Sequence, residues 1–197
     1  MTQLSITDDI RNKVEMAFDG FIGNTPAVYA IKRSLRVAWT HTPPTLDRVF
    51  LLVGGPSLGK TTLAKAIAGA LGVPFLSLDG SAVKTREQLF DALEDLLLDK
   101  EMHPKRVGER SGMPLLEYPS CAVFIDEVHT LGTGVQNALL TALEASDRSV
   151  VLSRAGVRRV AVVTNVLFMF ATTKQGLLDA HVRIKARLAE LPLETHG

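Results

Sequence analysis

The sequence lacks the features of an exported or membrane-spanning protein. Its 197 residues include a single cysteine, Cys121, so no internal disulfide can form, and this favours a reducing compartment in which the thiol is a small core group. No apolar stretch approaches the roughly 20 residues needed to cross a bilayer. The first residues, which include Asp8 and Asp9, lack the pattern of a signal peptide. We therefore expect a cytoplasmic protein with no membrane partner.

The sequence also has little net charge. Its 22 Lys and Arg residues nearly balance 21 Asp and Glu residues, which gives a formal net charge of +1. This balance argues against strong non-specific binding to nucleic acid or to an anionic membrane, although it allows a local basic face. Internal repeats and low-complexity segments are also missing. With 46% hydrophobic residues, the chain can bury the core of one large domain.

Hydrophobic periodicity predicts alternating strands and helices. Near-continuous apolar runs indicate buried strands, which lie at 49–53, 75–78, 121–125, 166–171 and 191–193. Helical patterns start at Thr25, with Pro26 in the first turn, and recur at 61–71, 85–98, 135–145 and about 177–188. This alternation is typical of an α/β fold in which helices cover both faces of a parallel sheet.

Three further segments complete the organisation. Residues 1–20 are expected to form a polar lead-in with a short helix around 8–18, and residues 21–197 are expected to form the main domain. Residues 149–163 predict a β-hairpin that turns at Ala155-Gly156. Residues 99–119 contain three prolines and a basic cluster, and we expect an irregular insertion there.

The segment after the first strand fits a phosphate-binding loop. It follows the pattern G-x-x-x-x-G-K-[ST] and is followed by Thr62; it reads Gly54-Gly55-Pro56-Ser57-Leu58-Gly59-Lys60-Thr61. Glycines let backbone N–H groups face phosphate oxygens, and a helix N-terminus adds partial positive charge. Lys60 can reach the β- and γ-phosphates, and the Thr61 hydroxyl can bind Mg²⁺. The alternative interpretation is an ordinary glycine-rich turn before a helix.

An acidic pair, Asp126 and Glu127, follows the third apolar run. Ligands of parallel sheets bind at the carboxyl ends of the strands, so we expect both side chains on the ligand side. Asp126 is then placed to hold Mg²⁺, and Glu127 to orient or deprotonate the water that attacks the γ-phosphorus. The alternative is a solvated pair at a strand end that helps to cap a helix.

The fourth apolar run ends in Thr172 and Thr173. If this strand lies between the strands that precede Lys60 and Asp126, a threonine hydroxyl there can contact the γ-phosphate or the attacking water. The alternative role is a helix N-cap or a turn residue. The two threonines can divide the two roles between them.

These three sites, in this order, resemble the AAA+ ATPases. The loop at 54–61 is similar to the Walker A motif of that family, the Asp126–Glu127 pair to Walker B, and Thr172 or Thr173 to sensor 1. The resemblance implies a P-loop NTPase core with a five-stranded parallel sheet of order 5-1-4-3-2 and a hairpin before sensor 1. It also implies ATP and Mg²⁺ as cofactors, with Lys60 and Glu127 in catalysis, and a homo-oligomeric ring, expected to be a hexamer.

Within the AAA+ ATPases, the sequence is most similar to the RuvB family of Holliday-junction branch-migration motors. Phe21-Ile22-Gly23-Asn24 resembles Tyr-Ile-Gly-Gln of that family, which packs near the adenine, so Phe21 and Ile22 are candidate nucleotide contacts. Residues 79–84 and 171–178 resemble two further segments of that family. The hairpin expected at 149–163 falls where that family has a hairpin that contacts the partner recognising the junction.

Three departures from that family bear on function. Ser57 stands where the family has glycine, a tolerable change if the local φ is negative. The family's arginine that reaches the nucleotide of a neighbouring subunit aligns without gaps with Arg183, while Arg187 is the alternative if a small insertion intervenes. The sequence stops near the fifth strand, so we expect the helical lid and the winged-helix DNA-binding domain to be absent.

Four kinds of activity remain open. A DNA motor is favoured by the resemblance and by six basic residues, Lys105, Arg106, Arg110, Arg154, Arg158 and Arg159. A protein remodeller usually has an aromatic residue beside glycine in the loop after the second strand, and residues 78–84 contain none. The third is a clamp-loader-like ATP switch. A non-enzymatic binding module is disfavoured because the complete set of candidate ATPase residues is present.

Overall fold

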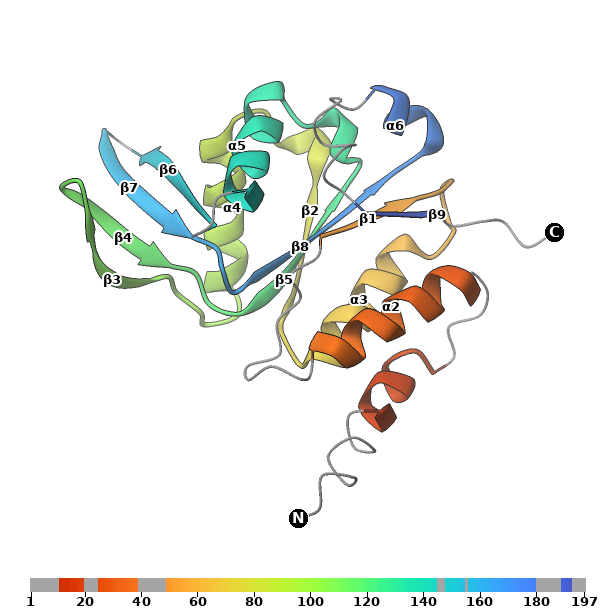
Figure 1. Cartoon of the computed structure of the whole chain (residues 1–197). Helices are drawn as coiled ribbons and strands as arrows, with labels where there is room; N and C mark the ends of the chain where they lie inside the picture. Colours follow the sequence, from red (N-terminus) through yellow and green to blue (C-terminus); the bar gives the residue numbers. More distant parts are fainter. Residues whose placement is uncertain are drawn as a thin grey trace, which may run out of the picture.

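The computed structural model describes residues 11–19, 25–38, 49–144, 148–154, 156–179 and 189–192. Within these ranges the strands form two sheets, and helices pack on both faces of the larger one (Figure 1). None of the helices in the same ranges has the length and apolarity that a membrane span requires.

Parallel strands form the central sheet in the order β2-β5-β8-β1-β9. In this order their bounds are Phe75–Asp79, Cys121–Asp126, Val166–Thr172, Phe50–Val53 and Ala189–Pro192. Strands β1 and β8 are buried throughout, as expected where helices cover both faces. β8 pairs in parallel with both β1 and β5, which is the place that the AAA+ resemblance implies for the sensor strand. The edge strand β9 pairs with β1 and begins at Ala189 rather than at the expected 191.

Four helices cover the two faces of the central sheet: α2 (Thr25–Ala38) and α3 (Lys60–Leu71) on one face, α4 (Arg86–Leu98) and α5 (Thr133–Glu144) on the other (Figure 1). Successive side chains of a strand point to opposite faces. Leu52 of β1 therefore joins the core under α2 and α3, whereas Leu51 joins the core under α4 and α5. Residues 11–17 are helical, and Val14 and Phe18 are buried in the core under α2.

Cys121 begins β5 and is buried, as the sequence predicts. Burial raises the pKa of its thiol to about 12. The thiol therefore stays protonated at neutral pH and packs as a small apolar group.

A second sheet lies beside the central one and joins two hairpins (Figure 1). β3 (Lys105–Arg110) pairs antiparallel with β4 (Met113–Glu117), and β6 (Ser149–Arg154) pairs antiparallel with β7 (Val157–Val162). The second pair confirms the hairpin predicted at 149–163. Parallel pairing of β4 with β7 gives the order β3-β4-β7-β6. The prediction of an irregular insertion over 99–119 is therefore wrong, because most of that segment is a β-hairpin.

The first hairpin escaped prediction because its local signals are weak. All residues of β3 are exposed, so this strand has no buried face to produce an alternating pattern. Ser111 and Gly112 both have positive φ, of 52° and 74°, which is the geometry of a two-residue type I′ turn. Pro114 lies in β4 before the pairing with β7 starts at Leu115, so its missing N–H removes no bond to β7.

A buried ionic group attaches the second sheet to α4. Arg159 of β7 lies 2.6 Å from the carboxylate of Glu94 in α4, and the exposed fractions of these side chains are 16% and 12%. The hydroxyl of buried Tyr118 donates to the same carboxylate at 2.5 Å. Burial, together with Glu94, raises the pKa of Tyr118, so the phenol keeps the proton that it donates. A buried carboxylate is costly without a partner, so this group holds the sheet and the helix together.

We expect Arg159→Ala to lower the free energy of unfolding by about 3–5 kcal/mol, because the largely buried Glu94 carboxylate would lose the guanidinium that lies 2.6 Å from it. The matched control is Arg158→Ala, at the neighbouring exposed position of the same strand, which should change the free energy of unfolding by less than about 0.5 kcal/mol. Urea unfolding of the two variants measures the difference. Equal stabilities would contradict the role assigned to the ion pair.

Candidate functional site

The loop over residues 54–59 connects the end of β1 to the start of α3. The Gly54 N–H donates to the Thr172 carbonyl at 3.0 Å, so the loop begins attached to the end of the neighbouring strand β8. Gly59 has a φ of 76° and a ψ of 18°, a left-handed conformation that glycine adopts without strain, and its carbonyl accepts the Leu63 N–H. The N-terminus of α3, with its partial positive charge, therefore lies at the carboxyl edge of the central sheet.

Lys60 is the first residue of α3, and only 7% of its surface is exposed. Its ammonium donates to the carbonyl oxygens of Gly54 at 3.1 Å and Gly55 at 2.9 Å. The cation thus lies over the loop whose N–H groups the motif assigns to phosphate. Of the two threonines that follow, Thr61 is half-buried and Thr62 is exposed.

Ser57 has a backbone conformation that glycine adopts more easily than serine. Its φ is 61°, so the condition under which serine would be tolerable here, a negative φ, is not met. A side chain in the left-handed region costs roughly 1–2 kcal/mol because Cβ approaches the following carbonyl oxygen. The loop keeps this conformation despite the serine, which indicates that its attachments at Gly54 and Gly59 determine its shape.

Asp126 ends β5, and Glu127 follows it in a left-handed conformation with a φ of 51° and a ψ of 45°. The half-buried Asp126 accepts the Glu127 N–H through Oδ1 at 2.9 Å. The Glu127 carbonyl accepts both the N–H of Thr130, at 2.8 Å, and its hydroxyl, at 2.7 Å. These bonds fix the backbone of the acidic pair, while the Glu127 side chain remains 40% exposed and can face a ligand.

The loop after β2 packs directly on the acidic pair. Asp79 is the parallel partner of Asp126, and Gly80 follows it in a short 3₁₀ turn. A Cβ on Gly80 would lie 2.7 Å from the Asp126 carbonyl oxygen and 2.8 Å from that of Glu127. A larger residue at position 80 would collide with these carbonyl groups. The loop after β2 is therefore in direct contact with the backbone that carries Glu127.

Thr172, which ends β8, and Thr173, which follows it, divide the expected roles. Thr172 is fully buried, and its hydroxyl lies 2.9 Å from Nδ1 of His129. The Thr173 hydroxyl accepts the Gly176 N–H at 2.9 Å and so caps α6 (Lys174–Asp179), which begins before the expected residue 177. Thr172 therefore remains the candidate sensor, and Thr173 is a helix cap.

His129 is the site residue that the sequence did not single out. It lies in the 3₁₀ turn η2 (Val128–Thr130) directly after the acidic pair. Its Nε2 lies 3.4 Å from the Glu127 carboxylate, and its Nδ1 contacts Thr172. The only available signal was its position just after Asp126-Glu127, because the contact with Thr172 joins residues that are far apart in the sequence.

The oxygen donors in this region fit Mg²⁺. Within the described ranges, no three His, Cys, Asp or Glu side chains gather as metal ligands. Thr61 and Asp126 supply hydroxyl and carboxylate oxygen, and Mg²⁺ typically combines one or two such protein ligands with phosphate oxygens and water.

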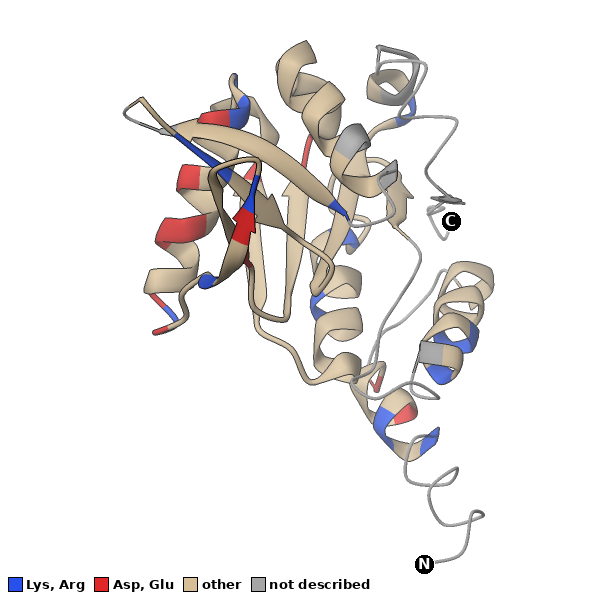
Figure 2. Cartoon of the chain, turned by 60° about the vertical axis from the view of Figure 1, so that its left-hand side comes forward, with Lys and Arg blue, Asp and Glu red and all other residues tan. Residues whose placement is uncertain are grey.

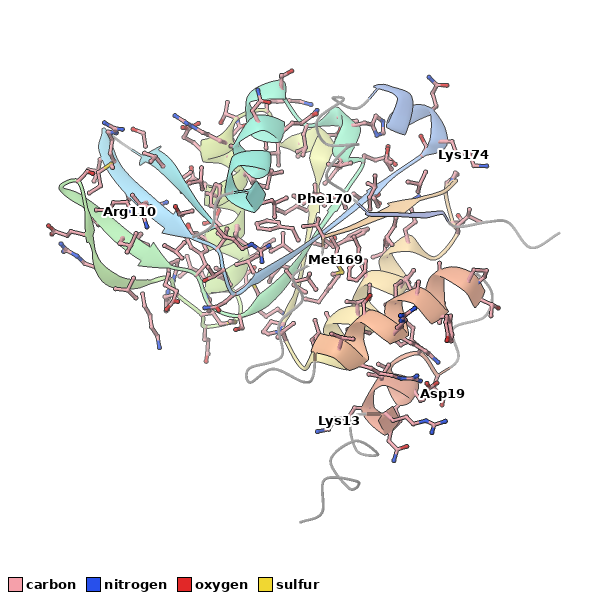
Figure 3. All side chains as sticks on the ribbon, viewed as in Figure 1. Lys13, Asp19, Arg110, Met169, Phe170 and Lys174 are labelled. Atoms are coloured by element: carbon pink, nitrogen blue, oxygen red, sulfur yellow. The ribbon has the colours of Figure 1, made fainter. Side chains whose placement is uncertain are left out.

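The remaining candidates lie outside the described residues: Phe21, Ile22, Arg183 and Arg187. The other candidates come from the ends of β1, β8 and β5, which are neighbours in the sheet. Figure 3 labels Lys174 at the start of α6, at this edge of the sheet, and Arg110 on the second sheet, well away from it.

Comparisons with known sequences agree with this arrangement. Residues 50–192 match the family described as "ATPase family associated with various cellular activities (AAA)". The Holliday junction branch migration complex subunit RuvB of Wolbachia pipientis wMel is 30% identical over 182 residues, which are 90% of this chain and 48% of that protein. The ATP-dependent zinc metalloprotease FtsH of Mycoplasmoides gallisepticum is 33% identical over 132 residues, which are 67% of this chain and 16% of that protein.

Solved structures of Thermotoga maritima RuvB are similar as well. The structure titled as the Holliday junction branch migration motor has a TM-score of 0.61 at 25% identity, and the match covers 91% of this chain and 48% of that one. A point mutant of the same protein has a TM-score of 0.63 at 25% identity, with coverages of 91% and 49%. The chain thus spans about half the length of these RuvB relatives and a smaller part of FtsH.

We expect Ser57→Gly to raise the free energy of unfolding by about 1 kcal/mol, because glycine removes the left-handed strain at this position. The control is Ser77→Gly, at an exposed position of β2, which should lower the free energy of unfolding by about 0.5–1 kcal/mol because a strand glycine loses more entropy on folding. Thermal or urea unfolding compares the two. Destabilisation by both substitutions would show that Ser57 is not strained.

Proposed function

We propose, from the premise that this chain belongs to the AAA ATPase family, that it binds ATP with Mg²⁺ at the 54–61 loop and hydrolyses it. The observation that carries the proposal is that β8 lies between β1 and β5. This order sets the phosphate loop, the acidic pair and Thr172 at adjacent strand ends, where ligands of parallel sheets bind.

Each residue of the site has a proposed task. Backbone N–H groups of the loop and the N-terminus of α3 would face the phosphates, and Lys60 would exchange its bonds to the loop carbonyls for phosphate oxygens. Thr61 and Asp126 would hold Mg²⁺, which neutralises charge on the β- and γ-phosphates. Glu127 would orient or deprotonate the attacking water. Thr172 would respond to the presence of the γ-phosphate.

The proposed assembly is a homo-oligomeric ring of the RuvB type, with a hexamer as the expected form. In it, Arg183, or alternatively Arg187, would reach the nucleotide bound by the neighbouring subunit. An arginine supplied in this way increases the rate of phosphoryl transfer by roughly 10³–10⁵. The similarity to RuvB over 90% of the chain supports this assembly.

The proposed work of the ring is movement of DNA, directly or through a DNA-binding partner. The second sheet is the candidate surface, since its strands carry all six of the basic residues noted above. Figure 2 shows basic and acidic residues together on this sheet. Arg159 is paired with Glu94, Arg106 with Glu109, and Arg110 donates to Ser149.

Among the basic residues of the second sheet whose side chains the structure describes, Lys105 and Arg158 are exposed and take part in none of these contacts, so they are the candidates for contacting phosphate. The side chain of Arg154 lies outside the described residues. Lys105 and Arg158 lie on β3 and β7, which are separated in the sheet by β4. Two charges are a small electrostatic footprint, which fits a modest contribution to DNA binding within a ring.

Protein remodelling is the second candidate, favoured by the similarity to the metalloprotease FtsH. Against it stands the loop over residues 78–84, which contains no aromatic side chain to grip a polypeptide. A clamp-loader-like ATP switch is the remaining alternative. The remodeller and the switch would use the same ATPase site as the DNA motor. The three activities are therefore distinguished by the ligand that stimulates ATP hydrolysis.

We expect Lys60→Ala to abolish tight ATP binding, because the cation that faces the phosphates is lost. Lys65→Ala, an exposed position of the same helix, should bind ATP normally. Glu127→Gln should bind ATP but not hydrolyse it, since the amide cannot accept a proton. Calorimetric titration and phosphate release measure the two properties. Normal turnover by Glu127→Gln would exclude Glu127 as the base.

We expect branched or duplex DNA, rather than an unfolded polypeptide, to stimulate ATP hydrolysis. Lys105→Glu combined with Arg158→Glu should reduce this stimulation and its salt dependence without changing the basal rate, because fewer phosphates are neutralised. Arg11→Glu combined with Arg33→Glu is the charge-matched control, with both substitutions at exposed positions on the helices at the other face of the central sheet. Stimulation by polypeptide alone would favour the remodeller.

A further inference from the structure

A chain of side-chain contacts links the candidate sensor to the candidate base. The Thr172 hydroxyl lies 2.9 Å from Nδ1 of His129. On the other side of the imidazole, Nε2 lies 3.4 Å from Oε2 of Glu127. The imidazole thus bridges Thr172 at the end of β8 and Glu127 directly after β5.

The proton positions in this chain follow from its donors and acceptors. An ionised carboxylate has no proton to donate, so the imidazole tautomer that suits this contact is the one with its proton on Nε2. In a neutral imidazole Nδ1 is then an acceptor, and the Thr172 hydroxyl is its donor. In this tautomer the Thr172 hydroxyl donates to Nδ1, and the Nε2 proton faces the Glu127 carboxylate 3.4 Å away.

Because Thr172 is buried, its hydroxyl meets His129 rather than solvent. The Thr172 side chain has no exposed surface, and its carbonyl is occupied by the Gly54 N–H. In the tautomer with its proton on Nε2, Nδ1 of His129 accepts the hydroxyl proton of Thr172, which can be donated to one acceptor at a time. Any ligand that changes the orientation of this hydroxyl therefore changes the hydrogen bond that holds the imidazole.

Gly176 provides the space for the contact. A Cβ on this residue would lie 2.6 Å from the Thr172 hydroxyl oxygen and 2.6 Å from Cε1 of His129, and it would also meet Nδ1. Gly176 is held by the cap at Thr173, whose hydroxyl accepts its N–H. The start of α6 therefore closes over the His129–Thr172 pair, and glycine at this place keeps the pair together.

Within the part of the chain that the structure describes, the contact found for the Glu127 carboxylate is the one with His129. The backbone of Glu127 is fixed by Asp126 and Thr130, but 40% of the side chain is exposed, whereas His129 is only 19% exposed. A fixed imidazole beside a solvated carboxylate selects among the rotamers of that carboxylate. Positioning of this kind matters in catalysis, because a displacement of about 1 Å can reduce a rate by about 10²-fold.

We propose that His129 is a positioning residue that transmits the state of Thr172 to the carboxylate of Glu127, which rests on the proposed role of Glu127 in ATP hydrolysis. His129 itself touches neither nucleotide nor water in this role. Its loss should reduce kcat while the affinity for ATP stays the same, because the residues assigned to the phosphates and to Mg²⁺ are not disturbed.

Two substitutions separate the two ends of the imidazole. His129→Asn keeps a polar group near the position of Nδ1 but does not reach Glu127, and we expect kcat to fall by about 10²-fold with little change in KM. His129→Gln places an amide nearer the position of Nε2 and should recover part of this loss. The control is His103→Asn, at an exposed histidine beyond α4, which should keep the kcat of the unaltered protein.

A double-mutant cycle tests the transmission. Thr172→Val removes the hydroxyl but keeps the shape of the side chain. It therefore breaks the contact between Thr172 and His129 by changing Thr172, whereas His129→Asn changes the other partner. The combined Thr172→Val/His129→Asn variant should be no slower than the slower single variant, because both remove one pathway. Multiplicative losses would mean that the two residues act independently, and would overturn the proposal.

The outcomes also distinguish this proposal from the ATPase function. If the unaltered protein hydrolyses ATP and Glu127→Gln does not, but His129→Asn has normal kcat, the function stands and the role of His129 is wrong. If His129→Asn and Thr172→Val both lose ATP affinity in proportion to kcat, the residues are structural and the role is again wrong. Failure of the unaltered protein to hydrolyse ATP would overturn both proposals.

Discussion

The pairing of β8 with both β1 and β5 is the interaction on which the site depends. Strands in a sheet are about 4.8 Å apart, so one intervening strand brings the ends of β1 and β5 to about 10 Å. Side chains that project from these two ends can then meet over the end of β8. The bond from the Gly54 N–H to the Thr172 carbonyl extends this pairing into the loop over residues 54–59, so the loop takes its position directly from the sheet.

Two residues of the site hold backbone conformations that side chains rarely adopt, Ser57 and Glu127. Strain of this kind persists where surrounding bonds over-determine the backbone, and it concentrates at functional sites. The bonds from Asp126 and Thr130 do this for Glu127, and the attachments of the loop do it for Ser57. A separate interaction, the ion pair between Arg159 and Glu94, holds the second sheet against α4. From the sequence alone, Arg159 was a candidate for a nucleic-acid surface.

The sequence predicted the parts of the structure that local signals determine. The loop between strand and helix at 54–59, the buried parallel strands and the hairpin at 149–163 each have a strong periodic or motif signal, and Cys121 was recognisable as a core residue. The hairpin formed by β3 and β4 was missed because its exposed strand has no pattern and its turn lacks the commonest residues. His129 was missed because its contact with Thr172 depends on how β5 and β8 pair, which only the folded chain displays. The positive φ of Ser57 likewise depends on the loop's attachments rather than on the residue itself.

The central claim is that three neighbouring strand ends form one binding site for a nucleotide triphosphate. Amide resonances of the isotope-labelled protein, followed by NMR during titration with ATP and Mg²⁺, test it most directly. The account predicts saturable chemical-shift changes at the backbone N–H groups of residues 54–61 other than Pro56 and at those of Glu127 and Thr172. All of these changes should reach half of their maximum at the same ATP concentration. Shifts confined to residues elsewhere, or none up to millimolar nucleotide, would contradict it.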